Sequence, residues 1–436
     1  MSAEGTGAPQ GVLAIRGGTV IDVAGERRAD LTIDGGRVIG VGLDVTVPAG
    51  AATLDAGGCM VGPGLVDLHT HLREPGGEEA ETVASGARAA ALGGYTAIVA
   101  MPNTEPAIDD AAMVRHVLGL GAGSCCDVRV AGAITVGRAG GHLAPMAEMA
   151  ALGVRLFTDD GRGVQDARIM RRALEYATAL DVTLAEHCQD EALAGGGHMN
   201  EGARSAALGL AGAPVEAEEV MVTRDLALCA LTGARMHFLH LSSAGSVEAV
   251  RRAKAAGLRV SAEAAPHHFT LTDDAVAGYD PVFKVNPPLR RPSDVSALKA
   301  GLADGTIDAV ATDHAPHPQE AKEASFEDAP PGMLGLDACL SLCLSELGLP
   351  VRAVLALLSW QPAAIAGIAS THGRPVRVGE PANLCVFDVK QRWTLDPARS
   401  GSRSRNSPYA GRTMIGRVRH TIAAGEAVVI DGQAQR

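Results

Sequence analysis

From Gly64 onward the chain alternates short apolar, strand-like runs with longer Ala-rich stretches of helical periodicity. This alternation is typical of an α/β fold with a parallel sheet, in which a crossover helix follows each strand. Eight runs predict strands at residues 65–71, 97–101, 128–134, 154–159, 183–187, 236–241, 259–264 and 309–313, and stretches such as 78–92 and 168–180 predict helices. Because no Gly-rich dinucleotide loop follows the first run, we predict a closed (β/α)8 barrel of the TIM type rather than an open doubly wound sheet.

A different pattern flanks this region at both ends. Residues 11–62 contain short runs of alternating hydrophobicity separated by Gly-Gly turns, and the same pattern returns after Pro381. We therefore predict a small β-sandwich module built from both termini. Its N-terminal part covers residues 1–62, the (β/α)8 catalytic barrel covers 63–370, and the C-terminal part of the module covers 371–436.

The composition limits the location and the partners of the protein. Hydrophobic residues make up 47% of the chain and charged residues 20%, as in globular proteins with a large core. The net charge of -12 disfavours nucleic-acid and anionic-membrane partners, so local cations would have to hold an acidic small molecule. A signal peptide and a run of 18 apolar residues are both missing, so we expect a cytoplasmic protein. The eight cysteines lack paired CxxC spacing, and we expect reduced core thiols, including Cys339 and Cys343 on a predicted helix.

The first predicted strand carries the sequence Asp67-Leu-His69-Thr-His71-Leu-Arg73. Side chains alternate across a strand, so these four polar side chains would share one face if the strand continued that far. A His-x-His pair on one face is half of a metal site, because zinc binds imidazole nitrogen at about 2.0–2.1 Å. For this motif alone, a pair of buried, hydrogen-bonded structural histidines is the alternative.

Other predicted strands also end in polar residues. The fourth ends in Asp159 and Asp160, the fifth in Glu186 and His187, the sixth carries His240, and the eighth ends in Asp313 and His314. In a barrel of parallel strands, residues at the carboxyl ends converge on one site. Four imidazoles and two carboxylates from five strands suit two metal ions with one bridging carboxylate. Six unrelated structural residues are the alternative, and that coincidence is disfavoured.

Several motifs in this order resemble the amidohydrolase superfamily and, within it, the bacterial dihydroorotases. They are Asp67-x-His69-x-His71-x-Arg73-x-Pro75-Gly76, Met101-Pro102-Asn103-Thr104, Thr158-Asp159-Asp160-Gly161, Glu186-His187-Cys188, Asn286-Pro287-Pro288-Leu289-Arg290 and Ala311-Thr312-Asp313-His314-Ala315-Pro316-His317. The resemblance spans nearly the whole chain. It implies a metal-dependent enzyme that interconverts (S)-dihydroorotate and N-carbamoyl-L-aspartate in pyrimidine biosynthesis.

The resemblance also implies roles for individual residues. Two Zn2+ ions per chain would be bound by His69, His71, Asp160, His187, His240 and Asp313. The substrate would contact His71, Arg73, Asn103, Asn286, His317 and the Pro331–Gly332 pair, which stands where relatives commonly have Phe-Gly. Many superfamily members bridge their metals with a carboxylated lysine on strand four, but all five lysines of this chain follow residue 253. An aspartate must therefore bridge. Strand alternation lets only one of Asp159 and Asp160 face the metals, and the resemblance favours Asp160.

The expected chemistry is the addition of water across a cyclic amide, with bound metals activating the water and polarising the carbonyl. Asp313 is the candidate proton carrier, since a carboxylate at the metals can act first as base and then as acid. A purely ligating Asp313 is the alternative. Arg73 offers a planar fork for the substrate carboxylate. The charged segment 316–335 is a candidate lid over the site, and we expect a hydrogen-bonded structural role for His267 and His268.

Two rival functions are compatible with the sequence. One is another cyclic amidase, a hydantoinase or allantoinase, which Arg73 and the missing lysine disfavour. The other is a non-catalytic partner subunit of aspartate transcarbamoylase, but such subunits tend to lose ligands and all six are present here. We expect a homo-oligomer and consider association with aspartate transcarbamoylase. The remaining histidines lack metal spacing and are expected to be core or surface residues: His116, His142, His198, His237, His372 and His420.

Overall fold

The computed structural model describes residues 11–436, so the first ten residues of the predicted N-terminal segment lie outside it. All eight strands expected from the alternation are present, several of them shorter than predicted. They are β8 (Leu65–Thr70), β9 (Tyr95–Ala100), β10 (Asp127–Val130), β11 (Leu156–Phe157), β12 (Thr183–Glu186), β15 (Met236–Phe238), β16 (Val260–Ala264) and β17 (Ala309–Val310). Two short strands, β13 (Met199–Asn200) and β14 (Gly212–Ala213), pair separately.

The eight strands pair in parallel and form a ring. Three of them pair in the order β10-β9-β8, and five in the order β11-β12-β15-β16-β17. Two parallel bridges join these sheets at both ends, Gly132 to Phe157 and Thr70 to His314. The carboxyl ends of all eight strands therefore open on the same side of the ring, where side chains from different strands can meet.

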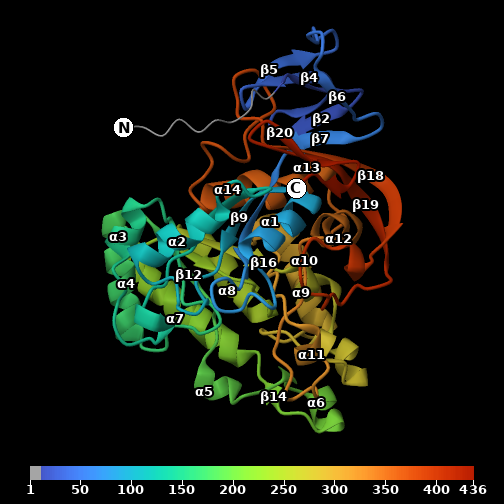
Figure 1. The fold of residues 1–436 in the computed structure, drawn as a ribbon. Coiled ribbons are helices and arrows are strands. Elements are labelled where there is room, and N and C mark those ends of the chain that lie inside the picture. The colour runs from blue at the N-terminus through green and yellow to red at the C-terminus, as the bar shows by residue number, and fades with distance from the viewer. Residues whose placement is uncertain (1–10) are drawn as a thin grey trace.

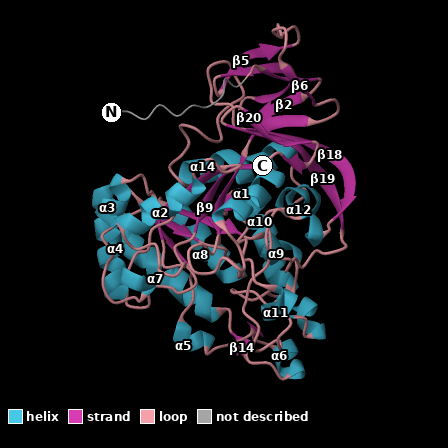
Figure 2. Cartoon of the chain, viewed as in Figure 1, coloured by secondary structure: helices cyan, strands magenta, loops and turns pink. Residues whose placement is uncertain are grey.

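Helices cover the outside of the ring (Figures 1 and 2). The longer ones are α1 (Val83–Leu92), α2 (Ala111–Gly121), α4 (Ala167–Leu180), α7 (Glu216–Thr232), α8 (Ala244–Ala255), α10 (Pro292–Asp304) and α12 (Cys339–Glu346). The shorter ones are α3 (Met146–Ala151), α5 (Glu191–Ala194), α6 (Ala203–Leu208), α9 (Pro266–Thr270), α11 (Gln319–Lys322), α13 (Val351–Leu355) and α14 (Gln361–Ile365). The first helix starts at Val83 rather than at residue 78, because the side chains of Thr82 and Ser85 form a capping box there.

Two further sheets flank this region, the first built from N-terminal strands alone and the second from strands of both ends of the chain. One has the order β5-β4-β1-β6 and the other β21-β20-β19-β18-β7-β2-β3. Their strands are β1 (Leu13–Arg16), β2 (Thr19–Asp22), β3 (Gly25–Arg28), β4 (Asp30–Asp34), β5 (Arg37–Gly42), β6 (Ala52–Asp55), β7 (Met60–Pro63), β18 (Leu384–Thr394), β19 (Thr413–Ala423), β20 (Glu426–Ile430) and β21 (Gln433–Ala434). A buried apolar cluster that includes Ile15, Leu31, Val61, Val386 and Ile422 joins the two sheets.

The cysteines have the environment expected of reduced core thiols. All eight cysteines are free and buried, and Cys339 and Cys343 lie in the same apolar core on α12. Burial raises the pKa of the Cys343 thiol well above its ordinary value, which favours an inert core thiol. Across residues 11–436, every helix is too short or too polar to cross a membrane.

Candidate active site

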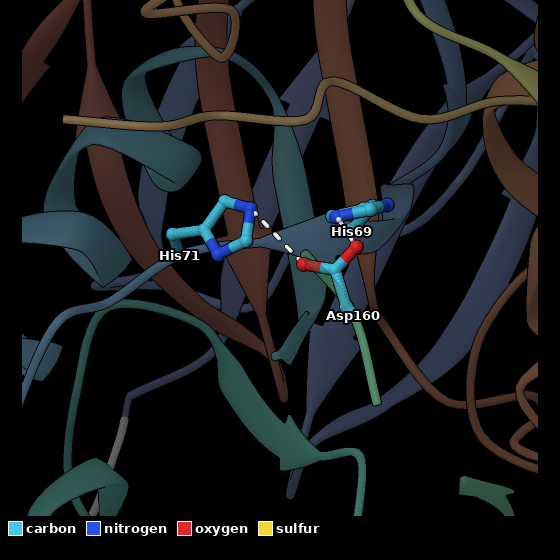
Figure 3. A group of neighbouring side chains, drawn as sticks. All are labelled: His69, His71 and Asp160. Atoms are coloured by element: carbon cyan, nitrogen blue, oxygen red, sulfur yellow. Dashed lines mark ion pairs between the residues drawn. The ribbon is translucent and has the colours of Figure 1, made fainter. Parts of the chain in front are cut away.

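The site is built around His69 and His71 at the end of β8. Both side chains are buried, and their Nε2 atoms lie 3.4 Å and 3.5 Å from the two carboxylate oxygens of Asp160. Figure 3 shows both imidazoles directed toward this one carboxylate. The strand ends at Thr70, so the expected continuation to Arg73 does not occur. Arg73 instead has a left-handed backbone with φ of 60°.

Asp160 also contacts two histidines from the other half of the ring. Its Oδ1 lies 3.7 Å from both His187 Nδ1 and His240 Nε2, and these two nitrogens are 3.0 Å apart. Burial favours the neutral acid, but His69 and the other imidazoles outweigh burial and hold the pKa of Asp160 well below its usual range. Two trios of metal-type ligands therefore share Asp160. One contains His69 and His71, the other His187 and His240.

The neighbouring Asp159 has a different environment. Its carboxylate accepts hydrogen bonds from the backbone N–H groups of Ile134, at 2.8 Å, and Thr135, at 3.0 Å, and from the Thr135 hydroxyl. These contacts hold the Asp159 carboxylate at Ile134 and Thr135, beyond the end of β11 at Phe157. Arg138 holds the backbone at this point, since its Nη2 donates to the Asp160 carbonyl at 2.6 Å.

Asp313 joins the first trio from the end of β17. Its Oδ1 lies 3.2 Å from His71 Nε2 and 3.6 Å from His69 Nε2. Burial would raise the pKa of this carboxyl, but the hydrogen bond from His71 and the charges of the imidazoles lower it below its ordinary value. Its other oxygen is 3.8 Å from His267 Nε2, a buried nitrogen without a hydrogen-bond partner in the described residues. Asp313 is therefore a carboxylate that faces several imidazoles.

Two predicted substrate residues contact imidazoles at the nitrogen that points away from Asp160. Asn103 Oδ1 lies 2.9 Å from His71 Nδ1, and Asn286 Nδ2 lies 3.2 Å from His187 Nε2. Each amide therefore fixes the orientation of a ring. The structure thus brings Asn103 and Asn286 next to the imidazoles of two candidate metal ligands.

The other predicted substrate residues form a second group. Arg73 donates from Nε to the Pro316 carbonyl at 3.2 Å, and its Nη2 lies 3.5 Å from His317 Nε2. His317 Nε2 also lies 2.9 Å from the Pro331 carbonyl. Burial and the charge of Arg73 lower the pKa of His317 to about 3, so this imidazole is neutral near pH 7.

Gly332 packs directly against this group. A Cβ at this position would lie 2.7 Å from His317 Nε2, and the backbone φ is 147°, so only glycine fits. Its N–H donates to the Lys284 carbonyl at 2.9 Å, and Pro331 has no N–H. The predicted segment 316–335 contains α11 and is anchored by Lys322, whose Nζ donates to the carbonyls of Pro281 and Pro330 at 3.0 Å and 2.8 Å.

Sequence reasoning missed a buried relay behind His69. Glu263 Oε1 accepts from His69 Nδ1 at 3.0 Å, and Glu263 Oε2 accepts from His237 Nε2 at 2.9 Å. His237 Nδ1 lies 2.8 Å from the Ser261 hydroxyl. Burial opposes ionisation of Glu263, but the two imidazoles lower its pKa to about 2. The sequence did contain a signal for this pairing. Glu263 lies within the apolar strand β16, and a charged side chain is almost never fully buried unless it is paired.

Asp67 was predicted to lie on the same face of the strand as His69. Its carboxylate joins β8 to the segment that follows β17. It accepts from the Thr312 backbone N–H at 2.9 Å and from the Thr312 hydroxyl. His268 Nε2 lies 2.9 Å from the Pro287 carbonyl, which fits the structural role expected for it. Asp67 thus closes the ring, and His268 supports the loop that carries Asn286.

The fold is found in solved members of the cyclic amidases. An L-hydantoinase from Arthrobacter aurescens superposes with a TM-score of 0.87 at 24% identity, covering 97% of both chains. A dihydropyrimidinase from Brevibacillus agri gives 0.86 at 23% identity, covering 97% of this chain and 96% of that one. The likeness to these structures shows the fold of this chain.

Sequence comparison narrows the class. A family model described as dihydro-orotase-like matches residues 58–246. A dihydroorotase of Streptomyces coelicolor is 51% identical over 426 residues, covering 96% of this chain and 98% of that protein. A dihydroorotase of Mycobacterium tuberculosis is 46% identical over 413 residues, covering 93% and 96%. This chain belongs to the dihydroorotase family.

Proposed function

We propose that this chain catalyses the reversible hydrolysis of (S)-dihydroorotate to N-carbamoyl-L-aspartate, a step of de novo pyrimidine biosynthesis. The observation that carries the proposal is the shared Asp160 between two pairs of histidines, in a chain that is 51% identical to a dihydroorotase over nearly its full length. The test is an assay of the purified, zinc-supplemented protein alone on dihydroorotate, hydantoin and allantoin. Turnover of dihydroorotate alone is expected. Preference for hydantoin or allantoin would favour another cyclic amidase, and no turnover would favour a partner subunit of aspartate transcarbamoylase.

The donor set fits the metal ions that the family uses. His69 Nε2 and Asp160 Oδ1 are buried and lack a hydrogen-bond partner in the described residues, as expected of atoms that bind a metal ion. We propose that His69, His71, Asp160, His187, His240 and Asp313 hold two Zn2+ ions, because six ligands exceed the three or four that one zinc takes. Bound zinc would lower the pKa of water and polarise the amide carbonyl.

Metal analysis after zinc reconstitution tests this ligand set. We expect about two ions per chain, since the two trios share only Asp160. Full activity with a stoichiometry of one or less would show that the second trio does not need a metal. The same measurement with cobalt and manganese would establish which ion supports turnover best.

Asp313 is the proposed proton carrier. During hydrolysis the carboxylate takes a proton from the attacking water and delivers it to the nitrogen that leaves as the amide C–N bond breaks; the reverse sequence closes the ring. Asp313→Asn keeps a ligand oxygen and removes the basicity, so we expect retained metal and a rate lower by about 10²–10⁴-fold in both directions. Near-normal turnover with metals in place would leave Asp313 as a ligand only.

For the substrate, we propose that Arg73 pairs with its carboxylate through the planar guanidinium fork. Asn103, Asn286 and His317 would line the same pocket, with His71 on the metal side. The Pro331–Gly332 pair would contribute shape and the Pro331 carbonyl rather than a free N–H, since Gly332 donates to the Lys284 carbonyl.

The division of the chain and its assembly complete the proposal. We propose that residues 63–370 form a closed (β/α)8 catalytic barrel and that residues 1–62 and 371–436 form one β-sandwich module. A homo-oligomer and an association with aspartate transcarbamoylase stay predictions. Light scattering of the purified chain, alone and mixed with that enzyme, measures both.

A further inference from the structure

A cleft of about 1050 Å³ lies between the barrel helices and the C-terminal strands. Its walls come from α1, α12, the end of β18, the following segment 395–401 and β19, which lie beside one another in Figure 1. Four arginines line it: Arg88, Arg392, Arg399 and Arg417. None of the six proposed metal ligands does. The cleft is therefore separate from the candidate active site.

Three of these arginines lack a protein acceptor. Arg88 donates to the Gly401 carbonyl from Nε and Nη2, at 3.4 Å and 3.2 Å. In contrast, within residues 11–436 the side chains of Arg392, Arg399 and Arg417 form no hydrogen bond or ion pair. Arg417 is half-buried, and burial together with the charge of Arg399 lowers its pKa. Like charges that face one cleft repel, and a bound anion would relieve this repulsion.

The carboxylates of the cleft do not neutralise these charges. Asp337 accepts from the Ser400 hydroxyl at 2.5 Å, and Asp396 accepts from the Ala398 backbone N–H at 3.0 Å. Asp396 thus caps a local turn, whereas the Asp337 bond joins two segments that are far apart in the sequence. Within residues 11–436 neither acid forms an ion pair with an arginine of the cleft. In a chain with a net charge of -12, a concave surface lined by four arginines and two aspartates is a local exception to the overall charge.

The shape and lining indicate the class of ligand. Guanidinium groups match the geometry of phosphate oxygens, and several of them can bind one phosphate. The volume is far larger than a free phosphate needs and lies at the upper end of the range for small-molecule sites, about 300–1,000 Å³. Leu92, Leu340 and Val418 add apolar surface to the cleft. The Trp393 ring, 5.4 Å from the Arg417 guanidinium carbon, adds an aromatic wall.

We propose that this cleft binds a phosphate-bearing small molecule of nucleotide size, with Arg392, Arg399 and Arg417 contacting the phosphate oxygens. The organic part of the ligand would lie against the apolar residues and Trp393. This site is independent of the proposed dihydroorotase activity, since its lining and the candidate active site share no residue.

The test uses the purified full chain and four probes: AMP, UMP, inorganic phosphate and uncharged adenosine. Calorimetry measures affinity and stoichiometry. Fluorescence reports on the cleft directly, because the chain has two tryptophans and Trp360→Phe leaves Trp393 as the sole emitter. We expect one nucleotide to bind per chain, to change the emission of Trp393 and to weaken with added salt, while adenosine does not bind.

Arginine substitutions distinguish specific binding in the cleft from non-specific attraction of the nucleotide to positive charge elsewhere on the protein. The double variant Arg392→Gln/Arg399→Gln should lower nucleotide affinity at least ~10-fold, since charge-assisted hydrogen bonds to phosphate are lost. Arg417→Lys should keep the charge but weaken binding, because the planar fork is lost. The matched control is Arg115→Gln/Arg172→Gln, which removes two exposed arginines from α2 and α4 and should bind like the wild type.

Three outcomes would overturn the proposal. The first is equal weakening by the control variant, which would assign the binding to overall charge. The second is an absence of binding by both nucleotides at ~5 mM in low salt, a weaker affinity than specific sites show. The third is inorganic phosphate binding as tightly as AMP and UMP, which would remove the nucleotide-size part of the inference. Circular dichroism and Tm establish that each variant is folded.

Discussion

Glu263→Gln tests how the candidate site controls His69. Glu263 is fully buried and accepts from His69 Nδ1 at 3.0 Å and from His237 Nε2 at 2.9 Å. The glutamine side chain has nearly the same size but no charge, and it has one oxygen where the carboxylate has two. At most one imidazole can then donate to it, and that bond is no longer charge-assisted.

The size of the effect follows from these bonds. A hydrogen bond to a charged group contributes about 1.5–3 kcal/mol, and about 1.4 kcal/mol is a factor of ten. Loss of one such bond behind a ligand therefore predicts a zinc affinity lower by about 10–100-fold, the usual cost of removing such a support. The activity at saturating zinc should fall less than the affinity, because the six proposed ligands are all retained.

The assay titrates zinc into the apo-protein against a chromogenic chelator, with turnover measured at saturating zinc. The control is Glu81→Gln, which changes another buried glutamate whose Oε2 lies 3.4 Å from a histidine, His314. Glu81 contacts none of the proposed ligands, so its variant should lose Tm and keep its zinc affinity. Wild-type zinc affinity in Glu263→Gln, or an equal loss in Glu81→Gln, would refute the role given to the relay.

Three more predictions concern single residues. Asp160→Ala should leave less than one metal per chain, whereas Asp159→Ala should lower Tm and keep the metals; elemental analysis decides, and the reverse result would exchange their roles. Arg73→Lys should lower kcat/KM for dihydroorotate at least ~10-fold with metal content unchanged, and wild-type kinetics would remove Arg73 from the site. Burial and the charge of Lys284 lower the pKa of Lys322 from 10.5 to about 7. Between these values the unfolded chain binds more protons, so stability should rise from pH 7 to pH 9 more steeply in the wild type than in Lys322→Met, by chemical denaturation; equal slopes would contradict this.

The strand predictions succeeded because hydrophobic runs and Ala-rich stretches recur with little interruption. Their ends were harder to predict. The strand predicted over 309–313 stops at Val310, and that over 236–241 stops at Phe238. Asp313 and His240 have positive φ values of 47° and 26°, which a strand cannot accommodate. Such backbone angles depend on tertiary contacts that hydropathy does not encode.

The candidate ligands could be predicted because residues of metal-binding type stand at the carboxyl ends of the predicted strands. Histidine and aspartate at strand ends converge in any barrel of parallel strands. Asp160 and Asp159 both follow the end of β11, so alternation along the strand could not choose between them, and the resemblance favoured Asp160, which contacts the imidazoles. Glu263 and His237 were missed, because their pairing joins two strands and is visible only once β15 and β16 lie side by side.

The hydrogen-bond partners of the ligand imidazoles matter as much for metal binding as the ligands themselves. An imidazole that binds a metal through one nitrogen must carry its proton on the other, so the partner of that other nitrogen fixes both the tautomer and the ring plane. Acceptor oxygens occupy this position for two histidines: Glu263 Oε1 next to His69 Nδ1 and Asn103 Oδ1 next to His71 Nδ1. The atom next to His187 Nε2 is the amide nitrogen of Asn286, a donor rather than an acceptor.

These partners differ in charge, and the charge decides how each ligand behaves. Among the described residues only His69 has a carboxylate in this position, and that carboxylate raises the basicity of its ring, whereas Asn103 orients the His71 ring without adding charge. Among the described residues His240 Nδ1 has no such partner, so its ring plane depends on packing and on the ion itself. The pair formed by His187 and His240 is thus less rigidly held than the pair formed by His69 and His71. Of the two proposed zinc ions, we therefore predict that the one at His187 and His240 leaves first when the protein is titrated with a chelator.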